Sequence, residues 1–477
     1  MKSRNVDVVI IGAGPAGYVA AIRLAQLGKK VTVVDRDGVG GVCLNRGCIP
    51  SKALIHAGTT FEKMNHSSEI GVEVTGAKIN MGKMIDWKES VVKKLTGGVG
   101  ALLKANGCEV ISGTAKFASP KTLVVKPVTG EEEILTFNAC IVATGSRPTN
   151  LPGFEIDQKI ILDSTGALDQ REKLASLLCI GGGYIGLELG TFYAKIGTKV
   201  TVVEASQNLL GGIDPELAKV VQKKLVARGV DVKVGVGVKS IKKNAKGADV
   251  LLANGETVSV EKVLVTIGRT PNSNDIGLDK AGVKVDSKGF VTVDATRKTN
   301  VPNIYAIGDL AGQPLLAHKG SKEGIVAAEV IAGKKTIYDV LGMPAVIFTD
   351  PEIATVGFTE AEAKEKGFNI QVGIFPFGAN GRALSVVEPD GFVKMIGDAK
   401  TGKLLGVHIV GAEASNLIAE ATLAIEMGAR IEDLALTVHA HPTLPETIME
   451  AAEATLGHAI HIFQKKKTVT NENTTTH

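Results

Sequence analysis

One pattern occurs twice in this chain and constrains its fold more than any other feature. Each copy reads as an apolar strand, a Gly-x-Gly-x-x-Gly turn, an apolar-periodic helix and a second strand that ends on an acid. The copies are separated by 181 − 12 = 169 residues. The matching positions are Gly12, Gly14, Gly17 and Asp35 in the first copy, and Gly181, Gly183, Gly186 and Glu204 in the second. The pattern predicts two Rossmann-like α/β domains.

Each position in the pattern has a physical task at a dinucleotide. The first glycine allows the tight turn, the second lets the backbone approach a pyrophosphate, and the third packs helix against strand. Backbone N–H groups at the helix start hold phosphates, and the final acid accepts ribose hydroxyls. Two glycine turns without a ligand are the alternative, but the register of strand, turn, helix and acid favours two dinucleotide sites.

The second acid also indicates which nucleotide binds there. A carboxylate at Glu204 repels a 2′-phosphate, and no arginine follows in residues 205–209 to receive one. We therefore expect NAD(H) rather than NADP(H) at the second site.

Composition excludes several other classes. A length of 477 residues predicts about three domains of roughly 150 residues each. Lys and Arg outnumber Asp and Glu by only 54 − 50 = 4, and this charge balance is too small to indicate a nucleic-acid-binding surface. No run reaches the ~20 apolar residues that a membrane span needs, and no signal peptide is recognised. The cationic run 465–467 lies in a polar tail that we expect to be a solvated, frayed terminus.

Cysteine usage points to a reducing, cytoplasmic location. Five cysteines are an odd number, which does not suit a secreted disulfide framework. Cys108, Cys140 and Cys179 stand alone in apolar surroundings and are expected in the core.

Cys43 and Cys48 lie five positions apart, directly after the first nucleotide pattern. A zinc site would need a second ligand pair, which the chain lacks, whereas two buried structural thiols or a reversible disulfide both remain open. On an ideal helix the two side chains would point about 140° apart, so a disulfide needs an irregular turn. Lys52 and Arg46 are cations that can lower a thiol pKa, although Arg46 equally suits a solvated side chain.

Thiol exchange also needs a base, and the segment around His439, His441 and Glu446 offers one. An imidazole oriented by a carboxylate moves protons near neutral pH. A structural histidine in a proline-bounded loop is the alternative, and the segment itself does not say which histidine acts.

The rest of the chain completes an α/β architecture with a C-terminal α+β domain. Strands are predicted at 291–293 and 304–307, and helices at 317–331, 360–366 and 415–427. The predicted regions are a first dinucleotide-binding domain 1–148, an NAD-binding domain 149–274, a central domain 275–345, a C-terminal domain 346–465 and a polar tail 466–477.

Residues 43–52, CLNRGCIPSK, resemble the redox motif of the dihydrolipoamide dehydrogenases, within the flavoprotein disulfide reductase family. Further matches to that family lie at 143–146, 183–188, 304–309, 349–352, 441–443 and Glu446. The resemblance runs from about Val6 to Phe463. It implies that region 1–148 is an FAD-binding domain, that 275–345 completes the FAD site and that 346–465 is a dimerisation domain.

The resemblance implies oxidation of dihydrolipoamide by NAD⁺ through FAD and a Cys43–Cys48 disulfide. Cys48 would face the flavin, Cys43 would exchange with substrate, and Lys52 would pair with Glu188 beside the flavin ring. His441, held by Glu446, would be the base, supplied across a homodimer interface. The implied FAD residues are Gly12, Gly14, Gly17, Asp35, Lys52, Ala115, Thr144, Gly145, Ser146, Asp309 and Ala317. The implied NAD residues are Gly181, Gly183, Tyr184, Ile185, Gly186, Glu204, Val238 and Gly268.

Three positions depart from the family pattern without touching the chemistry. Val42 stands where Thr is usual, Asp35 where Glu is usual, and Arg46 where Val is frequent. No lipoyl domain precedes the motif, so the resemblance implies a partner that carries one, either an acyltransferase core or the H protein of glycine cleavage.

Competing functions fit the sequence less well. Glutathione reductases normally use NADP(H), whose 2′-phosphate the carboxylate of Glu204 would repel. Mercuric reductases need a C-terminal cysteine pair, and no cysteine follows Cys179. Soluble transhydrogenases lack the thiol pair that this chain has. A non-enzymatic scaffold for an acyltransferase complex would have no use for two nucleotide sites and a thiol pair.

Overall fold

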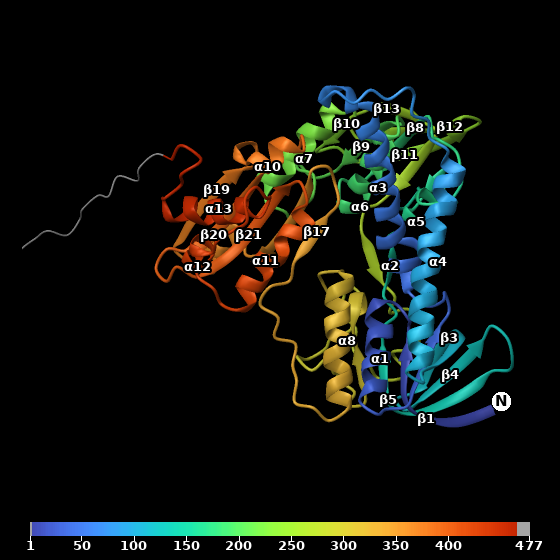
Figure 1. Ribbon diagram of the computed structural model, residues 1–477. Coiled ribbons are helices and arrows are strands. Elements are labelled where there is room, and N and C mark those ends of the chain that lie inside the picture. Colours follow the sequence, from blue (N-terminus) through green and yellow to red (C-terminus); the bar gives the residue numbers. More distant parts are fainter. Residues whose placement is uncertain (1, 465–477) are drawn as a thin grey trace, which may run out of the picture. The chain divides into compact units, whose positions relative to one another are not determined.

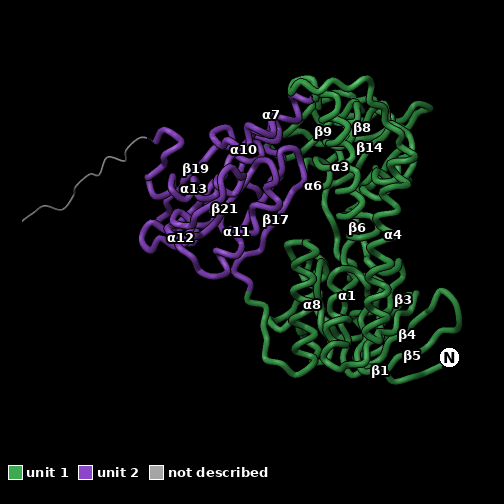
Figure 2. Tube along the Cα trace, viewed as in Figure 1, with its two compact units in different colours: residues 1–207, 229–339 green, residues 208–228, 340–477 purple. Residues whose placement is uncertain are grey.

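The computed structural model describes residues 2–464, and its contacts divide the chain into two compact units (Figure 2). Unit 1 comprises 1–207 and 229–339, and unit 2 comprises 208–228 and 340–477. Segment 208–228, which was expected inside the NAD-binding region 149–274, clusters with unit 2. The finer division into four folded regions stays a prediction, and the cationic run at 465–467 lies outside the described residues.

The first nucleotide pattern builds a six-stranded sheet in unit 1 (Figure 1). Residues 8–11 of β1 pair in parallel with both β2 and β5, which buries the strand on both sides. The helix α1 packs against α8 and α4 on one face of the sheet. The strands are β1 Lys2–Ile11, β2 Val31–Asp35, β3 Glu109–Ser119, β4 Thr122–Pro127, β5 Glu133–Val142 and β16 Ile304–Ala306; the helices are α1 Pro15–Gln26, α4 Met81–Ala105 and α8 Ala317–Ile331.

The second pattern builds a five-stranded parallel sheet in the same unit, in the order β10-β9-β8-β14-β7. Its helix α6 packs against α3, which begins at Cys48. The strands are β7 Ile161–Leu162, β8 Ser176–Ile180, β9 Lys199–Glu204, β10 Asp231–Val234 and β14 Lys262–Val265. Helix α6 Tyr184–Lys195 belongs to this second pattern, and α5 Ser164–Ala167 precedes its first strand β8. Helices α2 Gly41–Arg46 and α3 Cys48–Asn65 and the 3-10 turn η1 Ser67–Ile70 follow β2 of the first pattern. The predicted strands and helices of both patterns are confirmed.

Two smaller sheets accompany these layers. One is antiparallel and consists of β11 Val238–Asn244, β12 Gly247–Leu252 and β13 Thr257–Val260. The other joins β6 Ser146–Pro148 to β15 Arg269–Pro271.

One predicted strand is wrong. Residues 291–293 form no strand, because Val291 makes only an isolated bridge to Val285. Asp286 sits between them and accepts hydrogen bonds from the N–H groups of Lys288 and Phe290. This side-chain-stabilised turn brings two valines together without extending a ladder.

Unit 2 is built on a five-stranded antiparallel sheet in the order β17-β18-β21-β20-β19. Its strands are β17 Ala345–Ile347, β18 Glu352–Gly357, β19 Ile370–Pro376, β20 Phe392–Asp398 and β21 Leu404–Gly411. Its helices are α7 Pro215–Ala227, α9 Glu360–Glu365, α10 Gly381–Ser385, α11 Ala414–Glu426, α12 Ile431–Leu436 and α13 Glu446–Leu456, and a 3-10 turn η3 lies at Phe377–Ala379. Helices predicted at 317–331, 360–366 and 415–427 are confirmed. None of the helices in residues 2–464 combines the length and the apolar character of a membrane span.

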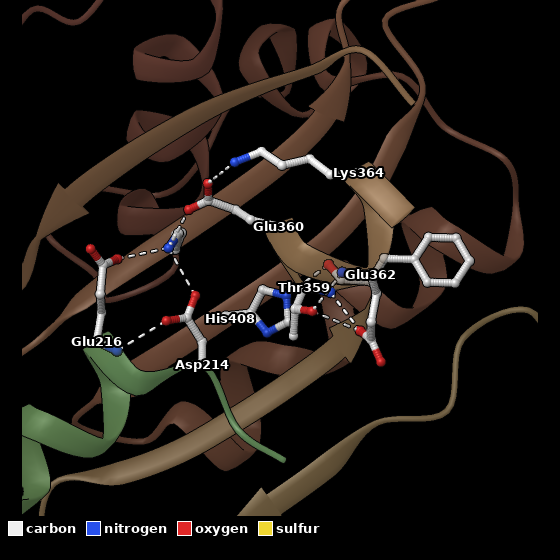
Figure 3. A network of polar contacts seen from close by, with 9 residues as sticks. Asp214, Glu216, Thr359, Glu360, Glu362, Lys364 and His408 are labelled. Carbon is white, nitrogen blue, oxygen red and sulfur yellow. Dashed lines mark hydrogen bonds and ion pairs between the residues drawn. The ribbon is translucent and has the colours of Figure 1, made fainter. Parts of the chain in front are cut away.

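Within unit 2, a buried lysine of β20 forms ion pairs with three carboxylates at the starts of α7 and α9. The Lys394 ammonium lies 2.8 Å from Asp214 Oδ2, 2.7 Å from Glu216 Oε2 and 2.5 Å from Glu360 Oε1. Figure 3 shows these three side chains converging on one amino nitrogen, with the buried His408 nearby. The cluster ties α7 and α9 to the sheet.

Candidate active site

The two glycine turns have the same construction. A Cβ atom on Gly12 would lie 2.3 Å from the Ala143 carbonyl oxygen, and one on Gly181 would lie 2.6 Å from the Thr266 carbonyl oxygen. Gly17 and Gly186 likewise allow each helix to approach the first glycine of its own turn. A Cβ on Gly17 would lie 1.9 Å from the Gly12 carbonyl oxygen, and one on Gly186 would lie 2.4 Å from the Gly181 carbonyl oxygen. Only glycine permits backbones this close, as the sequence pattern predicted.

The two acids occupy equivalent places at the ends of β2 and β9. The Ala13 N–H donates to Asp35 Oδ2 at 2.6 Å, and the Gly182 N–H donates to Glu204 Oε2 at 2.7 Å. Burial raises the pKa of Asp35, whereas at Glu204 hydrogen bonds from Ser206 and Gly182 outweigh burial and lower the pKa. Each carboxylate is thereby fixed at the mouth of its glycine turn.

A cavity of about 770 Å³ runs within unit 1 from the first glycine turn to the start of α6. Gly14 and Gly41 form part of its wall, and a Cβ on Gly41 would lie 2.6 Å from the Gly14 Cα. The predicted residues that line it are Gly12, Gly14, Asp35, Cys43, Cys48, Lys52, Ala115, Thr144, Gly145, Ser146, Tyr184, Ile185, Glu188, Asp309 and Ala317. A side-chain-free cradle at a helix start can hold a pyrophosphate, and an acid at the strand end can accept ribose hydroxyls, so the cavity suits FAD.

The remaining predicted nucleotide residues lie outside this cavity. Gly17, Gly181 and Gly186 allow the close backbone contacts within the two glycine turns, and Gly183 precedes the first residue of α6. Val238 opens β11, and Gly268 lies between β14 and β15, where its carbonyl accepts the Thr149 N–H. Glu204 completes the second turn.

The thiol pair sits at a break between two helices. Helix α2 ends at Arg46, Gly47 interrupts it, and α3 begins at Cys48. A Cβ on Gly47 would lie 2.9 Å from the Val42 carbonyl oxygen and 3.4 Å from the Cys43 Cα. This break is the irregular turn that the five-residue spacing required, and it brings the two thiols into a hydrogen bond.

The two thiols differ in acidity. The hydrogen bond from Cys43, helped by the charge of Lys52, lowers the pKa of Cys48 to about 7. The same hydrogen bond and burial raise the pKa of Cys43. Lys52 lies one turn further along α3 and pairs with the buried Glu188 of α6 at 2.9 Å. The arrangement therefore favours a thiolate at Cys48 and a protonated Cys43 near neutral pH.

Arg46 has a partner in the structure. Its guanidinium contacts Asp37 at 2.9 Å, two residues beyond the ribose acid. Arg46 thus links the redox helix to the end of β2.

The histidine segment lies in unit 2, and its two imidazoles differ. Both ring nitrogens of His439 are engaged, by Thr437 O and Glu420 Oε1, each at 2.8 Å, and its side chain is only 6% exposed. His441 contacts Glu446 through Nδ1 at 2.9 Å and is 79% exposed. Hydrogen bonds from Thr443 and His441 outweigh burial and lower the pKa of Glu446, so it stays ionised. Of the two histidines, only His441 leaves a ring nitrogen exposed to solvent.

Sequence reasoning missed a cation in the cavity wall. Arg269 donates from Nε to Ser146 Oγ at 2.7 Å, and that hydroxyl in turn donates to Asp309 Oδ2 at 2.5 Å. Arg269 is the first residue of β15, four residues after the parallel strand β14 ends, and this place beyond a parallel strand was the available signal.

Comparisons with known proteins show the family to which this chain is related. Two family profiles match: "Pyridine nucleotide-disulphide oxidoreductase" over residues 6–324 and the dimerisation domain of the same family over 343–452. The chain is 49% identical to a dihydrolipoyl dehydrogenase of Geobacillus stearothermophilus, over 97% of this chain and 98% of that protein. It is 47% identical to one of Halobacterium salinarum, over 97% and 99%. The crystal structure of LpdA from Mycobacterium tuberculosis superimposes with a TM-score of 0.89 at 28% identity, covering 94% of this chain and 99% of that one.

Proposed function

The chain belongs to the pyridine nucleotide-disulphide oxidoreductase family, and from this premise we propose that it oxidises a dihydrolipoyl group with NAD⁺, using FAD and the Cys43–Cys48 pair. One observation carries the proposal. A thiol pair with unequal acidity lies on the wall of a cavity that joins a dinucleotide turn to the start of α6. The two relatives that match 97% of this chain carry the name of that activity.

We assign the thiols separate roles in this reaction. The substrate thiolate attacks the Cys43 sulfur of the oxidised pair, which forms a mixed disulfide and releases Cys48 as a thiolate. The second substrate thiolate then displaces Cys43, which yields the cyclic disulfide of the lipoyl group and a reduced protein pair. Bound FAD supplies the two-electron link between the reduced pair and NAD⁺. Lys52, held by Glu188, keeps positive charge beside the Cys48 thiolate.

His441 is the proposed base for the substrate thiol. Glu446 fixes the ring through Nδ1, so the exposed Nε2 takes the proton and the carboxylate stabilises the resulting imidazolium. The dimerisation-domain match over 343–452 supports a homodimer. We propose that each thiol pair works with the His441–Glu446 pair of the other subunit.

The lipoyl group is proposed to arrive on a partner protein. An acyltransferase core and the H protein of glycine cleavage are the two carrier classes that suit this chemistry, and we expect the enzyme to act in the cytoplasm. Turnover measured with each lipoylated carrier and with free dihydrolipoamide separates these partners.

An anaerobic titration tests the proposed function. The purified protein should carry bound flavin, and one equivalent of dihydrolipoamide should produce a long-wavelength absorption band from the Cys48 thiolate beside the flavin. NAD⁺ should then remove the band and form NADH. A protein that binds flavin but shows no change with dihydrolipoamide would exclude this substrate.

A further inference from the structure

The turn that carries Asp309 is held from behind by a buried ionic cluster on α8. Glu323 is fully buried, and its Oε2 accepts the Gly308 N–H at 2.7 Å. Its other oxygen, Oε1, lies 2.9 Å from Arg297 Nη1 and 3.1 Å from Lys319 Nζ. The carboxylate therefore joins two cations to the backbone of one residue.

Lys319 holds the other side of the same peptide. Its ammonium, buried one helical turn before Glu323, donates to the Gly308 carbonyl at 3.2 Å and to the Gly312 carbonyl at 2.9 Å. The 3-10 turn η2, Gly308–Ala311, lies between these two carbonyls. Two side chains on one face of α8 thus fix both the N–H and the C=O of Gly308.

Asp309, the residue that follows Gly308, faces the cavity. Asp309 lines the cavity wall and is held there by the Ser146 hydroxyl at 2.5 Å, which Arg269 fixes in turn. The contacts from α8 fix the backbone that precedes Asp309, and the Ser146 hydroxyl fixes the Asp309 carboxylate. Both sets of contacts converge on one aspartate.

Packing alone does not explain why the charged side chains of Glu323, Lys319 and Arg297 meet beside the Gly308 peptide. Taking a carboxylate and an ammonium out of water is costly, and apolar residues of similar volume often stabilise a core as well or better. Here the buried groups direct their hydrogen bonds at the backbone of a single turn in the cavity wall. A charge-assisted bond to a peptide group restrains that peptide more strongly than apolar contact does.

We propose that Glu323 and Lys319 are positioning residues for the flavin: they preset the Gly308–Asp309 turn, so that Asp309 is in place before the cofactor binds. This inference rests on the proposed function, because it requires flavin in the cavity of unit 1. Preorganisation removes an ordering cost from binding, so loosening the turn weakens binding without a change in the contacts themselves.

The test compares flavin affinity in matched variants of the full chain. Glu323→Gln places an amide where a carboxylate met three donors, and Lys319→Met removes the two carbonyl contacts while it keeps the apolar stem. Each should raise the dissociation constant for FAD, measured by flavin fluorescence on the flavin-free protein, by about tenfold or more. Lys195→Met is the control, because Lys195 is also buried in unit 1 but lies on α6, where its ammonium contacts Glu62 and Thr59 of α3.

The outcomes separate positioning from general stability. A larger dissociation constant in both α8 variants, beyond that of the control at matched melting temperature of the flavin-free protein, supports the proposal. FAD affinity equal to that of the control overturns it. If Glu323→Gln does not fold, hydrogen exchange at the Gly308 amide of the flavin-free wild-type protein decides: slow exchange supports a preset turn, and exchange at the unprotected rate overturns it. A wild-type protein that takes up no flavin would instead refute the proposed function itself.

Discussion

Replacing Lys394 with methionine tests whether one buried charge holds unit 2 together. Methionine keeps most of the length and the apolar stem of lysine but removes the ammonium. Lys394 is 3% exposed, and without it the oxygens of Asp214, Glu216 and Glu360 face one another, with one oxygen of each within 4.8 Å of the others. The variant therefore loses three ion pairs and gains carboxylate repulsion.

The size of the effect follows from exposure. Removing one partner of a buried charge cluster costs about 3–5 kcal/mol. Asp214 is almost fully buried, but the side chains of Glu216 and Glu360 are 54% and 32% exposed, so solvent screens their share. We expect about 3 kcal/mol at pH 7. For a folding unit of about 150–250 residues, this corresponds to a fall in melting temperature of roughly 6–12 °C.

The loss should depend on pH. At Glu360 the hydrogen bond from Lys394 lowers the carboxyl pKa, and at Asp214 the same ammonium outweighs burial and lowers it. Carboxyls with a depressed folded pKa stabilise the fold above their unfolded pKa of about 4, and this stability is lost as the pH falls through the folded value. In the variant the same carboxyls repel and bind protons more readily. The difference between wild type and variant should therefore be fully present near pH 7 and shrink as the pH falls below about 4.

Calorimetry and hydrogen exchange are the suitable assays. The single tryptophan, Trp87, and all five tyrosines lie in unit 1, so intrinsic fluorescence would miss unfolding of unit 2. Lys400→Met, on the exposed turn after the same strand, is the matched control and should change the melting temperature by less than about 1 °C. A loss for Lys394→Met that equals the control, or that is the same at pH 7 and at about pH 3.5, would refute the electrostatic account.

Four further predictions follow from the same geometry. Lys394→Ala opens space among three carboxylates, so millimolar Mn²⁺ should raise its melting temperature but not that of wild type; equal shifts in both would contradict this. Cys48→Ser should abolish dihydrolipoamide turnover and spare electron transfer from NADH to a dye, and retained turnover would overturn the assigned thiol roles. Because the pKa of Cys48 is lowered to about 7, the long-wavelength band of the reduced enzyme should grow as the pH rises from 6 to 8, and a band that is constant over this range would argue against a Cys48 thiolate. With Glu204 fixed by Gly182, kcat/KM for NADH should exceed that for NADPH by at least about tenfold, as kinetics with both nucleotides will show.

Local sequence pattern predicted the nucleotide-binding elements well because their requirements are local. A glycine turn, a buried strand and an acid at the strand end act within one strand–helix–strand unit, so Gly12 with Asp35 and Gly181 with Glu204 could be found by spacing alone. The strand predicted at 291–293 failed for the converse reason. Its apolar residues suited a strand, but the Asp286 turn leaves only one bridge.

What the sequence determined by itself was the chemistry: two dinucleotide patterns, a thiol pair that requires a broken helix, and a histidine segment with a carboxylate. The tertiary structure decided how these residues differ from one another. It made Cys48 the more acidic thiol through Cys43 and Lys52, and it engaged both nitrogens of His439 while leaving His441 exposed. It also placed Glu323 and Lys319 behind the Asp309 turn. The physical reason is that acidity, exposure and backbone restraint depend on neighbours that lie far away in the sequence, and only the packed fold supplies them.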